Sequence, residues 1–282
     1  MSWATQPTRP TALVLAISLT LAVAGCGTRA PVPSASPTPT SALPGPVAST
    51  TAPALPTAAP ATPTPPPLPA SLVGREWSRL PTTQKVVALT FDAGNNDGGV
   101  ASILATLRAT GTPATFFLNG RWVQAHPADA RQIAAGGFSI GNHSADLVHF
   151  PTLGDSEARQ QILEGAQIIK SATGRDPRPW FRSPFGDLDA RTIKIVNSLG
   201  YGSIFWTTGT QGYLGTSGGQ SVSSAVTRVL GSLQPGEIVI LEVQANATDH
   251  STLDADALPT IIREVQQRGY QFVSLDQFMR TG

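Results

Sequence analysis

Short apolar segments alternate with segments of helical periodicity along residues 86–273, and no other feature of the sequence constrains the fold as strongly. The apolar runs predict strands at 86–91, 114–118, 138–140, 180–181, 201–206, 238–241 and 271–273. The periodic segments predict helices at 100–107, 127–135, 155–172, 189–199, 222–233 and 254–268. This alternation predicts an α/β fold with about seven parallel strands, either doubly wound or closed into a barrel.

Unusual polar side chains follow four of the predicted strands. Asp92 comes after the strand at 86–91, and His143 comes shortly after the one at 138–140. Arg182 and Glu242 directly follow two later strands. Parallel α/β barrels carry their chemistry on the loops at the carboxyl ends of the strands. The sequence therefore predicts a functional site that these four side chains share.

The amino terminus has the pattern of an export signal. Residues 11–24 form an uncharged apolar run after Arg9, shorter than the roughly 20 residues of a bilayer span. Val23-Ala24-Gly25-Cys26 resembles a lipobox, and Cys26 is the single cysteine of the chain. We expect residues 1–26 to be a lipoprotein signal peptide, with Cys26 as the lipid attachment site of an extracytoplasmic, membrane-anchored protein. A plain secretory signal and an uncleaved anchor are the alternatives.

The next segment is rich in Pro, Thr, Ala and Ser, and the composition then changes to that of a globular domain. Residues 27–78 are predicted to form a disordered stalk, because so few large apolar side chains cannot offset the entropy of ordering the chain. Residues 79–282 are predicted to form a single domain. The net charge of +1 and the absence of a basic run give no indication of nucleic-acid binding.

Three segments of the predicted domain resemble the motifs of one family. These are Leu89-Thr90-Phe91-Asp92-Ala93-Gly94, Ile140-Gly141-Asn142-His143-Ser144 and Phe181-Arg182-Ser183-Pro184-Phe185-Gly186. They resemble, in order, the Thr-Phe-Asp-Asp-Gly, Gly-Asn-His-Ser/Thr and Arg-x-Pro-Tyr-Gly motifs of the NodB-homology polysaccharide deacetylases, carbohydrate esterase family 4. The segment from 236 to 273 also follows the family pattern. The resemblance implies a distorted (β/α) barrel of the glycoside hydrolase/deacetylase type.

The resemblance also implies a reaction, the metal-assisted hydrolysis of an acetyl group on a glycan. In the family, one Asp and two His hold a divalent ion, usually zinc, and the ion polarises the acetyl carbonyl. The implied substrate is an N-acetylated glycan, either peptidoglycan or an exopolysaccharide, and the bond broken is the amide C–N bond. A second carboxylate serves as the base, and a histidine protonates the leaving amine.

Only part of this apparatus maps onto the chain. Asp92 matches the catalytic base, Arg182 the arginine that orients the base, and His143 the first metal-binding histidine. The sequence departs from the family at four positions, namely Ala93, Leu147, Gly209 and Glu242. Ala93 replaces the metal-binding Asp, Leu147 replaces the second His, and the segment around Gly209 lacks the carboxylate of the fourth motif.

Substitutes for the missing ligands lie nearby in the sequence. Asp97 and His149 are the candidate additional metal ligands, with Asp146 as a further possibility. Glu242 stands where the family has its acid histidine, and a carboxyl group acts as an acid near neutral pH only when burial or a like charge raises its pKa. We expect the charge of Asp92 to contribute to that rise.

Each candidate also has a structural interpretation. Asp92 could cap the following turn and His143 could be a core histidine. Arg182 could serve only to pair with Asp92, and Glu242 could be a residue tolerated after catalysis has lapsed. Two functions are therefore expected to compete. The first is a surface-anchored glycan deacetylase, and the second is a pseudo-deacetylase that serves as a glycan-binding or envelope protein.

Overall fold

The structure is a computed structural model, and it describes residues 68–281. These residues belong to one compact unit. The predicted signal peptide, the lipid attachment site at Cys26 and most of the predicted stalk lie outside the described residues, so they remain predictions. Within residues 68–281, no helix combines the length and the apolar composition that a bilayer crossing requires.

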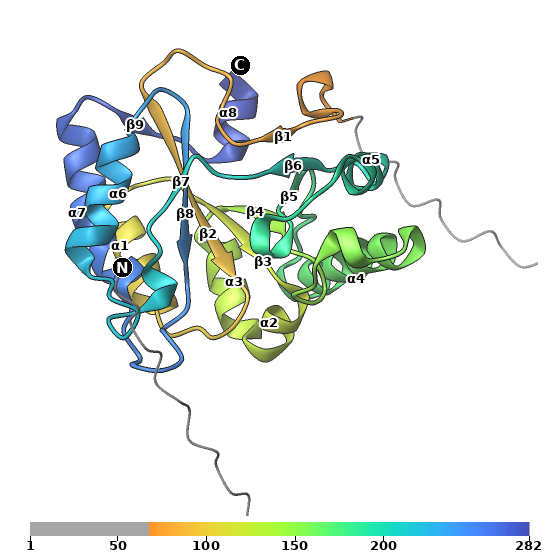
Figure 1. Ribbon diagram of the computed structural model, residues 1–282, viewed down its shortest axis with the longest axis horizontal. Coiled ribbons are helices and arrows are strands. Elements are labelled where there is room, and N and C mark those ends of the chain that lie inside the picture. Colours follow the sequence, from red (N-terminus) through yellow and green to blue (C-terminus); the bar gives the residue numbers. More distant parts are fainter. Residues whose placement is uncertain (1–67, 282) are drawn as a thin grey trace, which may run out of the picture. The chain divides into compact units, whose positions relative to one another are not determined.

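The centre of the described domain is a parallel β-sheet (Figure 1). Its strands are β1 (Glu76–Trp77), β2 (Val86–Ala93), β3 (Thr115–Leu118), β4 (Ser139–Asn142), β5 (Trp180–Phe181), β6 (Gly202–Ile204), β7 (Thr208–Gly209), β8 (Glu237–Glu242) and β9 (Gln271–Phe272). The strand order is β1-β6-β5-β4-β3-β2-β8-β7, and β9 pairs with β2. Every pairing between these strands is parallel. The predicted α/β class with a parallel sheet is confirmed.

The sheet curls into a distorted barrel because one segment of chain contributes to both ends of the strand order. β6 pairs with β5, whereas β7, which begins four residues after β6 ends, pairs with β8. The backbone between them also contributes, since Thr207 N donates to Ile238 O at 2.8 Å. The strand predicted at 201–206 is present as the shorter β6, and β7 is a second short strand that the sequence did not predict. The bend between them brings the two ends of the order together.

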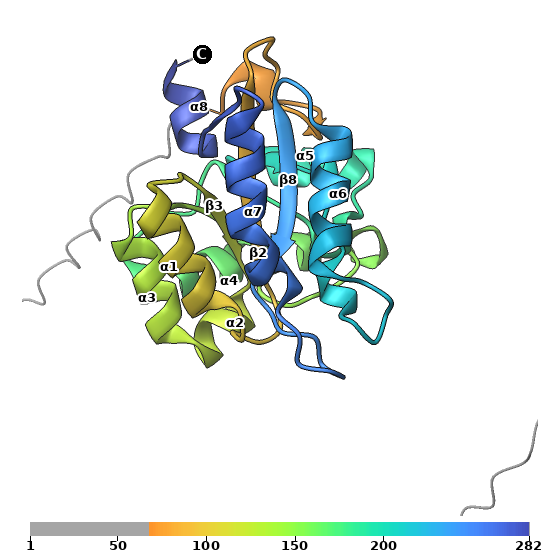
Figure 2. The ribbon, with the colours of Figure 1, turned by 90° about the vertical axis from the view of Figure 1, so that its left-hand side faces the viewer.

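Helices cover the outside of the barrel. They are α1 (Val100–Thr110), α2 (Gly120–Ala125), α3 (Pro127–Ala135), α4 (Asp155–Thr173), α5 (Ala190–Ser198), α6 (Val222–Ser232), α7 (Leu253–Gln267) and α8 (Leu275–Thr281). Figure 2 shows α1, α7 and α6 next to one another over β2 and β8. All six predicted helices are present, with ends shifted by at most three residues. The sequence did not predict α2 and α8, because such short helices are too brief to establish a helical period.

The folded domain begins earlier than the predicted boundary at residue 79. Leu72, in a short 3-10 helix (Ala70–Leu72), is fully buried, and Trp77 of β1 is 5% exposed. Both pack in a core cluster with Trp180 and Leu275. The predicted end of the stalk at residue 78 was therefore wrong, because composition changes gradually there and only these long-range contacts mark the boundary.

The alternation of side chains along β2 places Asp92 inside the barrel. Leu89 and Phe91 belong to the outer core that packs against the helices, whereas Ala88 belongs to the inner cluster. Because successive side chains of a strand point to opposite faces, Thr90 and Asp92 follow Ala88 on the inner face. Thr90 is fully buried, and Asp92 is the last inward-pointing residue of the strand.

Candidate active site

The four polar residues predicted from the strand ends meet at the carboxyl edge of the sheet. Asp92 on β2 lies opposite Glu242 on the neighbouring β8. His143 follows β4 and Arg182 follows β5. Asp92, His143 and Glu242 line one cavity of about 500 Å³, with Arg182 directly behind Asp92. These four side chains therefore lie together, as the positions of the strand ends predict.

Asp92 connects the two basic side chains of the group. Arg182 Nη1 donates to Asp92 Oδ1 at 2.7 Å, and His143 Nε2 lies 3.6 Å from Asp92 Oδ2. Asp92 is only 4% exposed. A carboxylate so deeply buried requires a partner charge, and the guanidinium supplies it. The remaining oxygen is directed to His143 and the cavity, where a general base must be.

Arg182 is fully buried, and its orientation is fixed by contacts on several sides. Its Nε donates to Ile204 O at 3.3 Å, and its Nη2 donates to Phe205 O at 3.0 Å. The guanidinium carbon lies 4.2 Å from the centre of the Phe117 ring. These contacts use both the planar donor set and the flat face of the group. Arg182 is therefore a positioning residue that holds Asp92 at the cavity.

His143 presents a neutral imidazole to the cavity. Its Nδ1 lies 2.9 Å from Arg182 O, and because a carbonyl only accepts, Nδ1 carries the proton. Burial lowers the pKa of His143, more strongly than the nearby Asp92 raises it. The Nε2 lone pair is therefore free to accept a hydrogen bond, or to ligate a metal, on the side of Asp92.

The carboxyl group of Glu242 has a raised pKa and keeps its proton to a higher pH than an ordinary glutamate does. Burial raises the pKa of Glu242 well above its ordinary value of 4.5, and the carboxylates of Asp92 and Asp254 raise it further. This agrees with the expectation that burial and Asp92 act together on this group. A protonated carboxyl group that faces a cavity across from a charged carboxylate is an arrangement suited to general acid catalysis.

Asp254 is a site residue that the sequence analysis did not identify. It lies in the first turn of α7, is 2% exposed, and its Oδ2 accepts a hydrogen bond from Glu242 N at 2.7 Å. Burial raises the pKa of Asp254 to about 6. A Cβ at Gly212 would lie 2.0 Å from Asp254 Oδ1, so only glycine fits at that turn. The available signal was an Asp on the buried, otherwise apolar stripe of α7.

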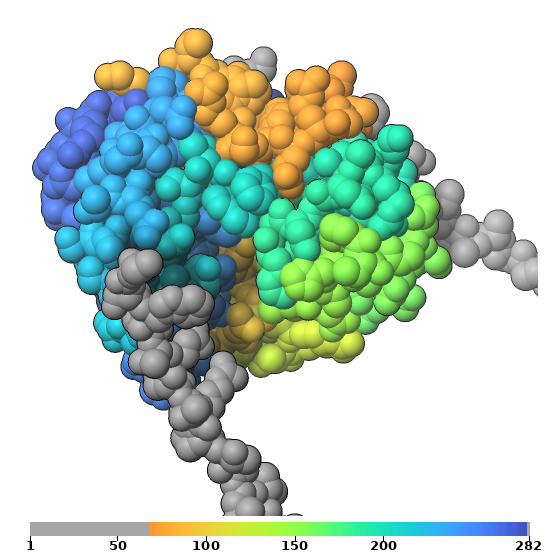
Figure 3. Space-filling view, in the orientation of Figure 1, coloured from red at the N-terminus to blue at the C-terminus, as the bar shows by residue number. Residues whose placement is uncertain are grey.

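Aromatic side chains form part of the cavity wall. Phe185, Trp206 and Tyr213 line it, and Phe185 and Tyr213 are 59% and 47% exposed. The face of the domain that Figure 3 shows is hollowed between its green and teal parts. A cavity with a few converging polar groups and exposed aromatic rings is typical of a small-molecule or glycan site.

The predicted metal ligands do not come together in this cavity. Asp97 pairs with His126 at 3.1 Å, and His149 pairs with Asp187 at 2.6 Å, so the partners that hold these side chains lie outside the cavity lining. Asp146 is similarly held, because Arg121 Nε donates to it at 2.6 Å. The prediction that Asp97 and His149 complete a site with His143 does not match this arrangement.

The residues that replace the family's metal ligands explain why no alternative metal site forms in the cavity. Leu147 lines the cavity with an apolar side chain, and Ala93 lies in the outer core with Phe91. Within residues 68–281, the only three His, Cys, Asp or Glu side chains with ligand atoms within 4.8 Å of one another are Asp97, His126 and Asp129. The cavity therefore lacks the three protein donors that zinc sites generally have.

Comparison with known proteins agrees with the geometry of this site. The family model for polysaccharide deacetylase matches residues 79–204. A peptidoglycan-N-acetylglucosamine deacetylase of Bacillus cereus is 29% identical over 201 residues, which cover 71% of this chain and 91% of that protein. A peptidoglycan-N-acetylmuramic acid deacetylase of Bacillus subtilis is 27% identical over 198 residues, which cover 70% of this chain and 73% of that protein.

Similar solved structures include a pseudoenzyme of carbohydrate esterase family 4. A carbohydrate esterase family 4 pseudoenzyme from Bacillus anthracis superposes with a TM-score of 0.67 and 27% identity, covering 73% of this chain and 70% of that one. A mutant of that pseudoenzyme has restored enzymatic activity and superposes with the same TM-score, at 28% identity over 73% of this chain and 72% of that one. The chain is thus similar both to named deacetylases and to a pseudoenzyme.

Proposed function

Because this chain is a divergent member of the polysaccharide deacetylase family, we propose that it hydrolyses the acetamide C–N bond of an N-acetylated envelope glycan. The observation that carries the proposal is the shared cavity of Asp92, His143 and Glu242, with Arg182 fixed behind Asp92. The base, its positioning arginine and a protonated acid are all present at the strand ends where this family has its catalytic site.

The proposed reaction uses these side chains for its proton transfers. Asp92 takes a proton from a water molecule whose oxygen adds to the acetyl carbonyl carbon. His143 Nε2 accepts a hydrogen bond from the same water and orients it. When the C–N bond breaks, the leaving nitrogen takes the proton of Glu242, and the products are acetate and a free amine on the sugar.

The family's divalent metal, with zinc as the expected ion, has no complete ligand set in this cavity. Family members bind the ion through one Asp and two His, whereas this cavity offers His143 beside Asp92 and has Leu147 where a further ligand is needed. When bound in relatives, such an ion polarises the carbonyl. The proton transfers of the proposed reaction therefore use only this chain's own residues.

The proposed substrate is peptidoglycan or a similar N-acetylated glycan. The named relatives act on peptidoglycan N-acetylglucosamine and N-acetylmuramic acid, and the exposed rings of Phe185 and Tyr213 offer flat surfaces for pyranose rings. We propose in addition that lipid on Cys26 anchors the chain to a membrane outside the cytoplasm. The Pro-rich stalk would then let the catalytic domain reach into the envelope.

A second candidate function is glycan binding without turnover. The observation that favours it is the replacement of the metal-binding apparatus by Ala93 and Leu147, together with the similarity to a pseudoenzyme. The cavity and its aromatic wall would serve this function unchanged. The two candidates therefore differ in product formation rather than in ligand binding.

The test is to incubate the purified full-length chain with N-acetylglucosamine oligomers and with isolated peptidoglycan and to measure acetate and free amine in equal amounts. Parallel calorimetry measures glycan binding. Equal release of both products, which Asp92→Asn lowers by about 1,000-fold, establishes the deacetylase. Saturable binding without either product, with or without added zinc, establishes the binding protein instead.

The proposed acid gives the reaction a characteristic pH dependence. Because the pKa of Glu242 is raised, the group stays protonated above its ordinary range and loses its proton only as the pH rises through the raised value. We expect kcat/KM to fall on the alkaline side for this reason. Glu242→Gln should lower kcat/KM by about 100-fold and remove that alkaline limb, as measured by acetate release across a pH series.

A surface glutamate of α7 provides the matched control for this experiment. Glu264→Gln makes the same chemical change away from the cavity, at a side chain that accepts a hydrogen bond from Arg268. It should leave both the rate and the pH profile unchanged. An unaltered alkaline limb in Glu242→Gln would remove Glu242 from the reaction.

A further inference from the structure

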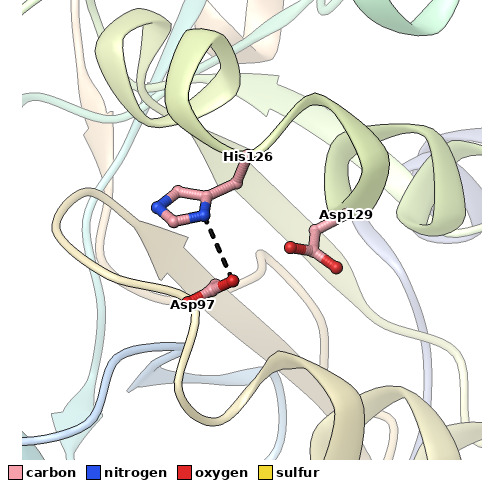
Figure 4. A group of neighbouring side chains, drawn as sticks. All are labelled: Asp97, His126 and Asp129. Carbon is pink, nitrogen blue, oxygen red and sulfur yellow. Dashed lines mark ion pairs between the residues drawn. The ribbon is translucent and has the colours of Figure 1, made fainter.

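Three side chains outside the catalytic cavity converge near the amino end of α3. They are Asp97, His126 and Asp129, and Figure 4 shows all three directed toward one another. His126 Nδ1 lies 3.1 Å from Asp97 Oδ2, and one ligand atom of each residue lies within 4.8 Å of the others. None of the three lines the catalytic cavity. The group is therefore separate from the site described above.

Three separate elements supply these side chains, and each element is firmly held. Asp97 lies in the loop between β2 and α1, where the neighbouring Asn96 O accepts from Trp122 Nε1 at 3.2 Å. His126 ends α2 and precedes α3, and its ring lies 5.3 Å from that of Trp122. Asp129 lies in the first turn of α3. The arrangement is thus preorganised, which lowers the entropic cost of binding a ligand.

The side chain of Asn96 fixes the same loop from its other side. Its Oδ1 accepts from Ala245 N at 2.8 Å, and its Nδ2 donates to Ala245 O at 2.9 Å. Asn96 Oδ1 also accepts from Gly98 N at 3.0 Å. The backbone on both sides of Asp97 is therefore held in place, so the position of its carboxylate follows from the fold.

The charges of the cluster are not balanced by a permanent cation. Among residues 68–281, no Lys or Arg forms an ion pair with Asp97 or Asp129, and His126 is the single basic partner. Two carboxylates that face each other repel unless a proton or a cation lies between them. The space between the carboxylates of Asp97 and Asp129 therefore favours a bound cation.

We propose that Asp97, His126 and Asp129 bind one divalent transition-metal cation, with zinc as the best match. Two carboxylate oxygens and one imidazole nitrogen form a donor set that suits zinc or manganese, whereas calcium prefers oxygen ligands throughout. Because the side chain of Asp97 is 47% exposed, water completes the coordination. Three protein donors and an open position are a ligand count that zinc accepts.

The bound cation connects the cavity rim to the outer helices. Gly94 and Asn95 line the catalytic cavity and belong to the same loop as Asp97. His126 and Asp129 belong to the α2–α3 segment. A cation held by both segments therefore fixes the loop that follows Asp92, and this structural effect is independent of whether the cavity turns over a glycan.

The experiment is calorimetric titration of the purified, metal-stripped full-length chain with zinc chloride, then with manganese and calcium chloride. We expect one equivalent of zinc to bind and the melting temperature to rise with zinc concentration. Asp97→Asn, His126→Gln and Asp129→Asn should each weaken zinc binding by about tenfold or more. Trp122 packs against His126, so its fluorescence should change on binding, and Trp122→Phe should remove that change.

Two variants serve as controls. His149→Gln breaks another exposed His–Asp pair, with Asp187, and should leave zinc binding unchanged. His143→Ala removes the one histidine among the residues that line the catalytic cavity and should also leave zinc binding unchanged. Zinc binding that is lost in His143→Ala but intact in Asp97→Asn places the cation in the cavity and overturns the proposal. A wild-type chain that binds no zinc at millimolar concentration overturns it equally.

Circular dichroism shows whether each variant is folded before titration. Asp129→Asn is a mild change, because Asn keeps the size and shape of the side chain and Asp129 is only partly buried. A folded Asp129→Asn chain that binds zinc as tightly as the wild type contradicts the assignment of Asp129 as a ligand. These outcomes do not depend on glycan turnover, so failure of the proposed function leaves this test intact.

Discussion

Asp92→Asn lowers kcat/KM for acetate release by about 1,000-fold, the largest effect on activity that we expect from a single substitution. Asn keeps the shape of the side chain and still accepts a hydrogen bond from Arg182, but it cannot take a proton from water. The measurement is acetate release from N-acetylglucosamine oligomers, with kcat and KM determined separately. We expect the loss to lie in kcat, since proton transfer belongs to the transition state.

The matched control is Asp155→Asn, the same chemical change at a surface residue that pairs with Arg191. It should leave kcat/KM within about a factor of two, as is usual for a surface change. Because Asp92→Asn leaves a buried guanidinium without its counter-charge, the melting temperature of each variant is measured as well. A folded Asp92→Asn chain with wild-type turnover would contradict the assignment of Asp92 as the base.

The sequence predicted the parts of the site that depend on strand ends. Asp92, His143, Arg182 and Glu242 each follow a strand that its apolar residues identify, and parallel pairing then brings them to one edge. Spacing along the chain was sufficient for these residues, because the sheet itself fixes their relative positions. The same reasoning gave the parallel α/β architecture and every helix long enough to show a period.

Loop residues did not follow from spacing. Asp97 and His149 lie a few residues after strands that enter the site, but the partners that decide their orientation, His126 and Asp187, come from other elements. Asp254 lies on α7 and contacts the site through its carboxylate, which accepts a hydrogen bond from Glu242 N. A long-range hydrogen bond of this kind leaves no periodic signal in the sequence.

The departures from the family motifs form a consistent chemical set. Ala93 and Leu147 withdraw metal ligands, whereas Glu242 adds a buried carboxyl group to the cavity, and the buried carboxylate of Asp254 accepts a hydrogen bond from its backbone. Like charges in a buried site favour protonation of at least one of them. Under the proposed function, a site built in this way relies on the carboxylic acid of Glu242 where the family uses a metal ion and an acid histidine.

Arg182→Met lowers the free energy of unfolding by about 3–5 kcal/mol, the largest effect on stability that we expect in the described domain. Met fills a similar volume, but Asp92 is 4% exposed and loses the guanidinium that balances its charge. The carbonyls of Ile204 and Phe205 lose their donors at the same time. Urea unfolding monitored by circular dichroism measures the loss, provided that the transition is two-state.

The double variant Asp92→Asn/Arg182→Met separates the charge from the packing. If the cost of Arg182→Met comes chiefly from the unpaired Asp92 carboxylate, the double variant unfolds at a higher urea concentration than Arg182→Met alone. Arg191→Met, which breaks an exposed ion pair with Asp155, should cost within about 1 kcal/mol. Equal costs for the two arginine variants would contradict the claim that Arg182 is held as a buried partner of Asp92, because only a buried pair leaves an uncompensated charge when one member is removed.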